Sequence, residues 1–273
     1  MKNPERTAGS IQVIDRASDL LEAIARYTQA VSLKVLAAET GLHPSTTFRI
    51  LASLVEHDFV ARDEGGTYRL GPRFLKYAAR VRADLDLRAV ARPEMERLRD
   101  AIGETVNLTV REGDEVIYVE RALPNRMMRV EQIIGSRAPL HVTAVGKIML
   151  GDAGAEETLA YARRTGLPAY TPRTLNDPER LLAAADKALE NGFAFDDEEA
   201  ETGVGCIGAL VRDGSGTAVA GLSISAPIER RRNEWAPLLI DAACRISERL
   251  GYRCENLPPR KTGGKTARTK TGR

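Results

Sequence analysis

The sequence predicts an α+β protein with a helical N-terminal part and a separate domain of mixed strands and helices. Apolar residues recur at helical spacing in residues 11–56. From Gly103 onward, longer stretches alternate apolar and polar residues, as is typical of strands. The chain has 273 residues, of which 43% are hydrophobic and 29% charged, an ordinary composition for a globular protein. We therefore expect two domains, joined by residues 72–102.

The composition argues against several classes of protein. No run approaches the roughly 20 apolar residues that cross a bilayer, and the N-terminal MKNPERTAGS lacks the apolar stretch of a secretory signal. We therefore expect a cytoplasmic protein without a membrane partner. Cys206, Cys244 and Cys254 are widely spaced and form no CxxC motif, which argues against a disulfide framework and a structural zinc site and fits a reducing compartment.

The formal charge of +2 is unevenly distributed. Residues 1–100 contain 16 basic residues (Lys and Arg) and 14 acidic ones (Asp and Glu), and residues 101–255 contain 18 basic and 24 acidic residues. Residues 256–273 contain 6 basic residues and no acidic one. An acidic middle argues against a chain that coats nucleic acid uniformly, but a localised DNA-reading surface remains compatible with it. Residues 1–10 and the basic tail, residues 256–273, are predicted to be disordered.

Three short helices are predicted within residues 11–56. Apolar residues recur at helical spacing in residues 11–27, Ser32 stands where it can cap the helix LKVLAAET, and Gly41 suits the left-handed residue that ends it. Pro44 marks the start of a third helix. Two helices joined by a tight glycine turn predict a helix-turn-helix.

A β-hairpin is predicted after the third helix. Two short β-rich runs, residues 59–62 and 67–70, surround Asp63-Glu64-Gly65-Gly66, which is a strong turn signal. Three helices followed by such a β-wing predict a winged helix-turn-helix, which we assign to residues 11–71.

The segment HPSTTFRILASL begins polar and ends apolar, which predicts a DNA-reading face on the first turn of the third helix. Free backbone N–H groups and the helix dipole favour phosphate oxygens there, and hydroxyl groups add hydrogen bonds. An arginine one turn later suits guanine or phosphate. The predicted DNA-binding residues lie on this turn and on the wing strands: His43, Ser45, Thr46, Thr47, Phe48, Arg49, Arg62 and Arg69.

The competing interpretation is that the hydroxyl cluster only caps the helix. Thr47 falls on the inward stripe with Leu51 and Leu54, and this turns Phe48 outward. An aromatic ring at that position either contacts thymine methyl groups in the major groove or packs on a neighbouring protein surface.

Residues 72–102 are rich in helix formers, with Pro93 as the only break, and predict a helical linker. Its apolar residues Leu75, Ala78, Ala79 and Val81 suit dimer contacts, because two winged helices need a fixed spacing to read two half-sites. The alternative is a helix that packs only on its own domain.

From Gly103 the pattern predicts a mixed domain, which we assign to residues 103–255. Alternation on both sides of Glu112-Gly113-Asp114 predicts a hairpin, and residues 126–134 have the pattern of a further strand. The remaining predicted elements are, in order, a helix in LHVTAVGKIMLG, helices at 155–166 and 178–191, strands in CIGALVRD and AVAGLSISAP, and a final helix at 234–251.

The sequence contains no convincing catalytic constellation. The four consecutive carboxylates from Asp196 to Glu199 are the best candidate for a magnesium or acid–base site, but such runs are usually solvated turns. The chain has no GxSxG, GxxxxGK[ST] or HExxH motif, and Cys206 has no nearby histidine in the sequence. We therefore expect no enzyme, no catalytic residue, no metal site and no cofactor.

The chain resembles the IclR family of bacterial transcriptional regulators over residues 10–252. The motifs that carry the resemblance are, in order, GLHPSTTFRILASL, GETVNLTV, LHVTAVGKIML, FAFDDEEAETGVGCIGALVRD and GLSISAPIER. The resemblance implies a winged helix-turn-helix followed by a GAF-like effector-binding domain. It also implies a homodimer, often a dimer of dimers, that represses or activates a nearby operon.

The resemblance further implies where a small organic acid binds. Ala144 and Val145 would offer backbone N–H groups to a carboxylate at a helix N-terminus. Ser223 and Ser225 share one face of a strand, as a grip of two hydroxyl groups requires. The other matching positions are polar Asp196 and Cys206 and apolar Leu140, Met149 and Val204.

The chain departs from the family pattern at four positions. A basic residue is common near Pro44, an apolar one at Thr47 and a small or polar one at Phe48, so half-site preference is not transferred from relatives. Val145 stands where a smaller residue is frequent in the family, which predicts a narrower pocket or a less polar ligand.

We expect a ligand-responsive DNA-binding regulator, a repressor of a catabolic operon, with a 2-oxo acid or an aromatic carboxylate as effector. Its expected partners are double-stranded operator DNA, the carboxylate, and further copies of the chain in a homodimer or dimer of dimers. The alternative is a small-molecule sensor or enzyme that uses the helix-turn-helix only for protein contacts.

Overall fold

The structure is a computed structural model that describes residues 11–84 and 86–254, without the side chains of residues 79 and 81–84. These residues form two compact units, which divide between residues 85 and 86. The ends predicted to be disordered, residues 1–10 and 256–273, lie outside the described residues.

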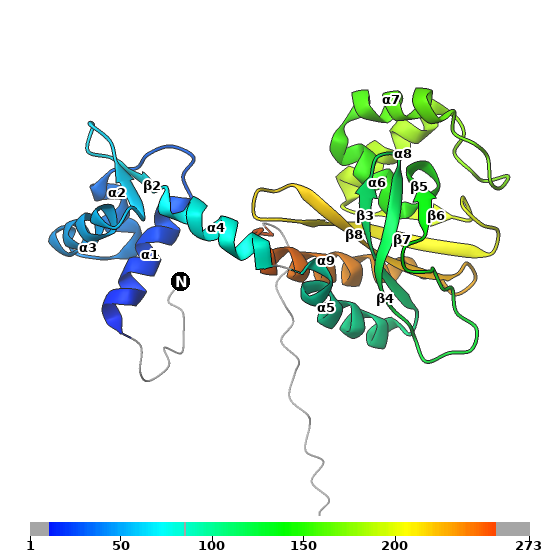
Figure 1. Ribbon diagram of the computed structural model, residues 1–273, viewed down its shortest axis with the longest axis horizontal. Helices are drawn as coiled ribbons and strands as arrows, with labels where there is room; N and C mark the ends of the chain where they lie inside the picture. The colour runs from blue at the N-terminus through cyan, green and yellow to red at the C-terminus, as the bar shows by residue number, and fades with distance from the viewer. Residues whose placement is uncertain (1–10, 85, 255–273) are drawn as a thin grey trace, which may run out of the picture. The chain divides into compact units, whose positions relative to one another are not determined.

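The first unit is the predicted winged helix-turn-helix. Its elements are α1 (Gln12–Ala25), α2 (Leu33–Thr40), α3 (Pro44–Glu56), β1 (Val60–Arg62) and β2 (Tyr68–Leu70) (Figure 1). Gly41 ends α2 with a φ of 65°, the left-handed conformation that the sequence predicts. Ser32 occupies the N-cap position of α2, but its side chain makes no capping hydrogen bond, so that expectation is wrong.

One hydrophobic core holds the three helices and the hairpin of the first unit together. Leu20 and Ile24 of α1, Leu36 of α2 and Leu51 of α3 are buried, and Tyr68 closes the core from the wing. The backbone of Tyr68 also exchanges two hydrogen bonds of 2.8 Å with Val31, in the connection between α1 and α2. The wing is therefore fixed to the helices by backbone pairing as well as by packing.

The predicted linker contains two helices, α4 (Arg73–Asp84) and α5 (Leu87–Ile102). The prediction that Pro93 breaks the helical stretch is wrong, because α5 continues through Pro93. The side chain of Asp86 accepts a hydrogen bond of 3.0 Å from the amide of Arg88 and so caps α5. Burial of its apolar face against the second unit stabilises α5 although a proline removes one backbone donor.

The second unit contains a six-stranded antiparallel sheet in the order β5-β4-β3-β8-β7-β6. Its strands are β3 (Thr105–Glu112), β4 (Glu115–Ala122), β5 (Arg137–Pro139), β6 (Ala194–Asp197), β7 (Val204–Arg212) and β8 (Ala218–Pro227). The predicted β3–β4 hairpin and the two long strands after residue 200 are confirmed.

The strand predicted at residues 126–134 is wrong. These residues form an irregular segment, and the sheet takes β5 as its edge instead. Polar side chains hold the segment: the hydroxyl of Thr105 donates to the carbonyl of Val130 at 2.5 Å, and Arg121 donates to the carbonyl of Gln132. These contacts occupy backbone acceptors that a strand ladder would use.

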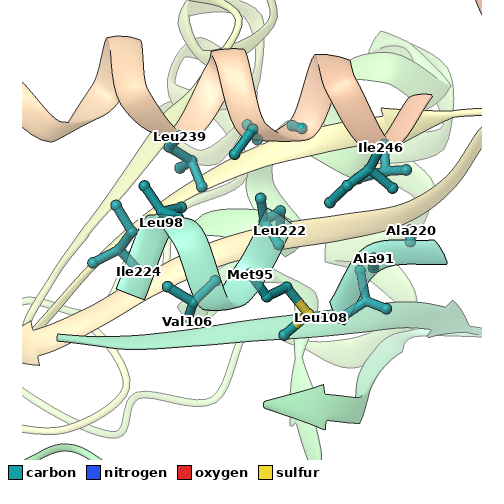
Figure 2. Packing of buried hydrophobic residues seen from close by; sticks show 14 of the residues in the cluster. Ala91, Met95, Leu98, Val106, Leu108, Ala220, Leu222, Ile224, Leu239 and Ile246 are labelled. Carbon is teal, nitrogen blue, oxygen red and sulfur yellow. The ribbon is translucent and has the colours of Figure 1, made fainter. Parts of the chain in front are cut away.

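Helices cover both faces of the sheet (Figure 1). One face is covered by α5 and by α9 (Ala236–Arg249), and the other by α6 (Ala144–Ala153), α7 (Ala155–Thr165) and α8 (Pro178–Asn191). Figure 2 shows Met95 and Leu98 of α5 and Leu239 of α9 packed with Leu222 of the sheet in the first of these cores. Both units together give the predicted α+β architecture.

A buried carboxylate fixes α5 to α9. Glu94 of α5 is 1% exposed, and Arg245 and Arg249 of α9 approach its oxygens at 2.7 and 3.3 Å. Arg97 of α5 is a further partner. Because a carboxylate is buried at low cost only when it is paired, this cluster makes α5 an integral part of the second unit.

Two further findings concern the expectations drawn from composition. Cys244 and Cys254 form a disulfide, although their spacing argued against a disulfide framework, whereas Cys206 is free. The disulfide joins Cys244, within α9, to a residue ten positions later. The spacing of the cysteines gave no sign of this pairing. In the described part of the chain, no helix is long and apolar enough to span a membrane.

The N-terminus of α6 lies unusually close to the sheet because glycines stand beneath it. A Cβ atom on Gly208 of β7 would lie 2.6 Å from the amide nitrogen of Val145, and a Cβ on Gly221 of β8 would overlap the side chain of Val145. Gly221 and Gly208 therefore leave the space that the first turn of α6 occupies. This close approach positions the cavity described below.

Gly221→Ala is expected to destabilise the second unit by about 1–3 kcal/mol, because its methyl group enters space held by Val145. The melting temperature, followed by circular dichroism, should fall by several degrees. Val145→Ala in the same chain should restore part of this loss, since it removes the overlapped methyl groups. Two losses that simply add would contradict the proposed steric conflict.

Candidate functional site

The first candidate surface is the N-terminal turn of α3. His43 is the N-cap residue: its Nδ1 accepts from the amide of Ser45 at 3.4 Å and lies 2.8 Å from the Ser45 hydroxyl. The imidazole therefore takes the capping role, and Ser45 stays exposed beside it.

Most of the predicted DNA-binding side chains of this unit are exposed. Phe48 is 49% exposed, as the helical stripe predicted, and Arg49 is exposed next to it. Arg62 and Arg69 are exposed on the wing, where the guanidinium of Arg62 lies 5.7 Å from the centre of the Tyr68 ring. Thr46 is half-buried.

Thr47 requires a correction. Its side chain is fully buried, and its hydroxyl donates to the carbonyl of His43 at 3.2 Å. Thr47 is therefore a packing residue, because the inward stripe that contains Leu51 also contains this position.

The second candidate site is a cavity of about 70 Å³ in the second unit, between the sheet and the first turn of α6. That volume is several times the roughly 10–15 Å³ that one water molecule needs. Six of the nine predicted effector-binding residues line it: Ala144, Val145, Asp196, Val204, Cys206 and Ser223.

The other three predicted residues lie outside the cavity wall. Leu140 and Met149 are buried in the core formed with α7 and α8. Ser225 is buried beside the cavity, where its hydroxyl lies 3.2 Å from Nδ2 of Asn107 and 3.2 Å from Sγ of Cys206. Of the two predicted ligand-binding hydroxyl groups, only that of Ser223 lies at the cavity.

The first turn of α6 has unused hydrogen-bond donors on residues that line the cavity. The amide of Gly146 donates to the capping Thr143 hydroxyl at 3.0 Å, and the amide of Lys147 donates to the Thr143 carbonyl at 3.0 Å. The amides of Ala144 and Val145 have no acceptor within the described residues. Two free N–H groups at the positive end of a helix form an anion-binding geometry.

Burial at the cavity perturbs three titratable side chains, those of Asp196, Cys206 and Tyr118. Burial raises the pKa of the Asp196 carboxyl from 3.8 to about 6, although the amide of Glu199 donates to Oδ1 at 2.8 Å. Burial and the neighbouring Asp196 charge raise the pKa of the Cys206 thiol, so this cysteine stays protonated. Burial likewise raises the pKa of Tyr118.

Several cavity residues were missed by the sequence-based prediction. They are Thr109, Val116, Tyr118, Gln132, Ala138, Thr143, Ala200 and Glu201. Tyr118 pairs with Thr109 and Thr109 with Gly221 in the sheet register, so the hairpin pattern carried a signal for Tyr118. Gln132 lies in the irregular segment that was predicted as a strand, and no sequence pattern placed it at the cavity.

The two candidate surfaces belong to different units: the first turn of α3 to the first, and the cavity to the second. Among the described residues, no group of three or more His, Cys, Asp or Glu side chains is placed to hold a metal ion. The fold and the two surfaces define a DNA-binding regulator with a small-molecule sensory domain.

Comparison with known proteins gives the family. Residues 13–64 match the IclR helix-turn-helix domain, and residues 79–248 match the C-terminal domain of bacterial transcriptional regulators of the IclR type. The chain belongs to the IclR family of bacterial transcriptional regulators, as the sequence motifs indicated. It is a ligand-responsive DNA-binding regulator and not an enzyme.

Individual relatives are similar over most of their length. The HTH-type transcriptional regulator KipR of Bacillus subtilis is 34% identical over 230 residues, which is 83% of this chain and 92% of KipR. The crystal structure of the Agobacterium tumefaciens repressor BlcR is 30% identical, with a TM-score of 0.73 over 90% of this chain and 100% of BlcR. An IclR homologue from Microbacterium hydrocarbonoxydans, in complex with 4-hydroxybenzoate, is 26% identical, with a TM-score of 0.56 over 87% and 98%.

The raised pKa of Asp196 predicts how stability depends on pH. Above pH 6 the folded protein holds a buried ionised carboxylate, whereas below pH 4 the group is protonated in both folded and unfolded states. The cost therefore grows as pH rises from about 4 to 6 and amounts to about 1–3 kcal/mol at neutral pH. Asp196→Asn, whose amide oxygen can still accept from Glu199, should raise the melting temperature at pH 7.5 by several degrees.

This advantage of the Asn variant should shrink steadily as the melting measurement is repeated down to pH 4.5. A difference that stays constant with pH, or a variant that is less stable throughout, would show that Asp196 is not a strained carboxylate.

Proposed function

We propose that the protein is a repressor of a catabolic operon that binds operator DNA through α3 and the wing, and a small carboxylate effector in the cavity. The observation that carries the effector assignment is the pair of free amides of Ala144 and Val145 at the cavity wall. They match a carboxylate in charge and in hydrogen-bond demand. The similarity to BlcR, which is a repressor, supports the proposed sign of regulation.

The apolar wall of the cavity favours an aromatic carboxylate over a short 2-oxo acid. Val116, Ala138 and Val204 supply apolar wall, and the Tyr118 hydroxyl forms no hydrogen bond within the described residues. A hydroxybenzoate would use the apolar wall for its ring and polar groups such as Tyr118 for its hydroxyl. The homologue in complex with 4-hydroxybenzoate supports this choice.

The DNA-reading face consists of the exposed residues on α3 and the wing. The Ser45 hydroxyl and Arg49 suit phosphate and base contacts, while His43 accepts the hydrogen bonds of the first amides of α3. Phe48 stands beside Arg49, where its ring is available to thymine methyl groups or to a protein surface.

We also propose a homodimer, and a dimer of dimers, acting in the cytoplasm. Reading a two-fold operator requires two winged helices. Exposed apolar side chains support an assembly: Ile11, Val13 and Ile14 on or beside α1, and Met127, Met128, Ile133 and Ile134 in the segment after β4.

Arg49→Ala combined with Thr46→Ala should weaken binding to DNA from upstream of the protein's own gene at least tenfold, because contacts to phosphate and base edges are lost. Mobility shifts at one fixed salt concentration give the measurement. Arg88→Ala is the matched control, since it removes one exposed arginine from the second unit. Unchanged binding of the double variant would favour a helix-turn-helix used only for protein contacts.

The effector proposal predicts that 4-hydroxybenzoate binds more tightly than pyruvate or glyoxylate, and that 4-hydroxybenzamide, which lacks the carboxylate, does not bind. Calorimetry and thermal-shift measurements on the full chain test this order. Ser223→Ala should weaken the binding about tenfold through one lost hydrogen bond, whereas Ser215→Ala, on an exposed turn, should not. Equal binding of the acid and the amide would contradict an anion site at Ala144 and Val145.

A further inference from the structure

The loop between β6 and β7 forms one wall of the cavity. We call residues 198–203, between β6 and β7, the wall loop; its Ala200 and Glu201 line the cavity. It begins at Glu198 and ends at Gly203, which have φ values of 61° and 86°. Left-handed backbone at both ends marks the points where the chain changes direction.

Glu199 connects this loop to the rest of the site. Its carboxylate pairs with Nζ of Lys147, and both side chains are almost fully buried. Its amide donates to Oδ1 of Asp196 at 2.8 Å, and its carbonyl accepts from the hydroxyl of Thr174 at 2.7 Å. Lys147 lies two residues after Val145 on α6, so the ion pair joins the wall loop to the turn that presents the free amides.

The ion pair depends on both of its members. A buried charge is tolerated when it is paired, and removal of one partner leaves the other uncompensated in a poorly solvated place. Glu199 without Lys147 would therefore gain by moving its carboxylate toward water.

The loop has space for such a movement on its outer side. Lys147 and Glu199 also line a surface groove of about 250 Å³, together with Leu175 and Lys187. The wall loop thus separates the cavity, which Asp196 and Ala200 line, from a groove that is open to solvent.

We infer that the Lys147–Glu199 pair is a latch that holds the wall loop against the cavity and sets how long the effector stays bound. Lys147 and Glu199 are positioning residues, because neither lines the cavity. The inference rests on the proposed effector site, but the closure of the loop is measurable without any effector.

Hydrogen–deuterium exchange on the full chain tests the latch alone. In Lys147→Met and in Glu199→Gln, amides in residues 198–204 should exchange at least tenfold faster than in the wild type, with other peptides unchanged. Lys147→Arg, which keeps the cation, should stay near the wild type. Asp152→Asn is the matched control, since it breaks the Arg212–Asp152 pair at the other end of α6. Equal exchange rates of residues 198–204 in Lys147→Met, Glu199→Gln and Asp152→Asn would overturn the proposed latch.

Stopped-flow dissociation of 4-hydroxybenzoate tests the link to the effector. Lys147→Met should release it at least tenfold faster while its association rate changes less, and Asp152→Asn should release it at the wild-type rate. Equal release from all three proteins would overturn the role in retention. A wild type that binds none of the acids, with a loop that still opens in Lys147→Met, would overturn the effector assignment and leave the mechanical latch standing.

Discussion

The close approach of α6 to the sheet is the constraint on which the second unit depends. Gly208 and Gly221 carry no side chain, so the first turn of α6 rests directly on β7 and β8. This contact brings the amides of Ala144 and Val145 to the cavity and carries Lys147 to Glu199 one turn later. A side chain beneath the helix would displace both the anion-binding amides and Lys147 from the sheet. The packing of α6 therefore determines the geometry of the proposed site.

Buried carboxylates elsewhere in the unit are paired, and this separates them from Asp196. Glu94 meets three arginines, and Glu104 accepts from Arg126 and Arg230 at 2.8 Å. These pairs hold α5 and the loops in place. Asp196 receives a backbone amide and a thiol, and burial raises its pKa. A carboxyl left without a cationic side chain of its own, at a cavity wall, suits a ligand that brings a hydrogen-bond partner.

Much of the fold was predictable because local chemistry decides it. Gly41, Pro44 and the turn at residues 63–66 each fix backbone geometry by themselves, and the winged helix-turn-helix follows from their spacing. Predictions failed where tertiary contacts decide. The alternating pattern of residues 126–134 is overridden by side chains that take its backbone acceptors, and α5 continues past Pro93 because its apolar face is buried. The Cys244–Cys254 disulfide requires the end of α9 to turn back, which spacing alone does not state.

The cavity shows the same division between local and tertiary information. Residues within the family motifs, such as Ala144 and Asp196, were placed at the site by the resemblance to the family. Strand periodicity placed Ser225 on the correct face, but it cannot tell which of two hydroxyl groups lies under open space and which lies against Asn107. Tyr118 and Gln132 come from a neighbouring strand and an irregular segment, so their place at the cavity depends on register and loop path. The selectivity of the proposed effector site therefore depends on residues such as Tyr118 and Gln132, which no sequence motif indicates. Its recognition of the carboxylate depends on the start of α6, which a sequence motif does indicate.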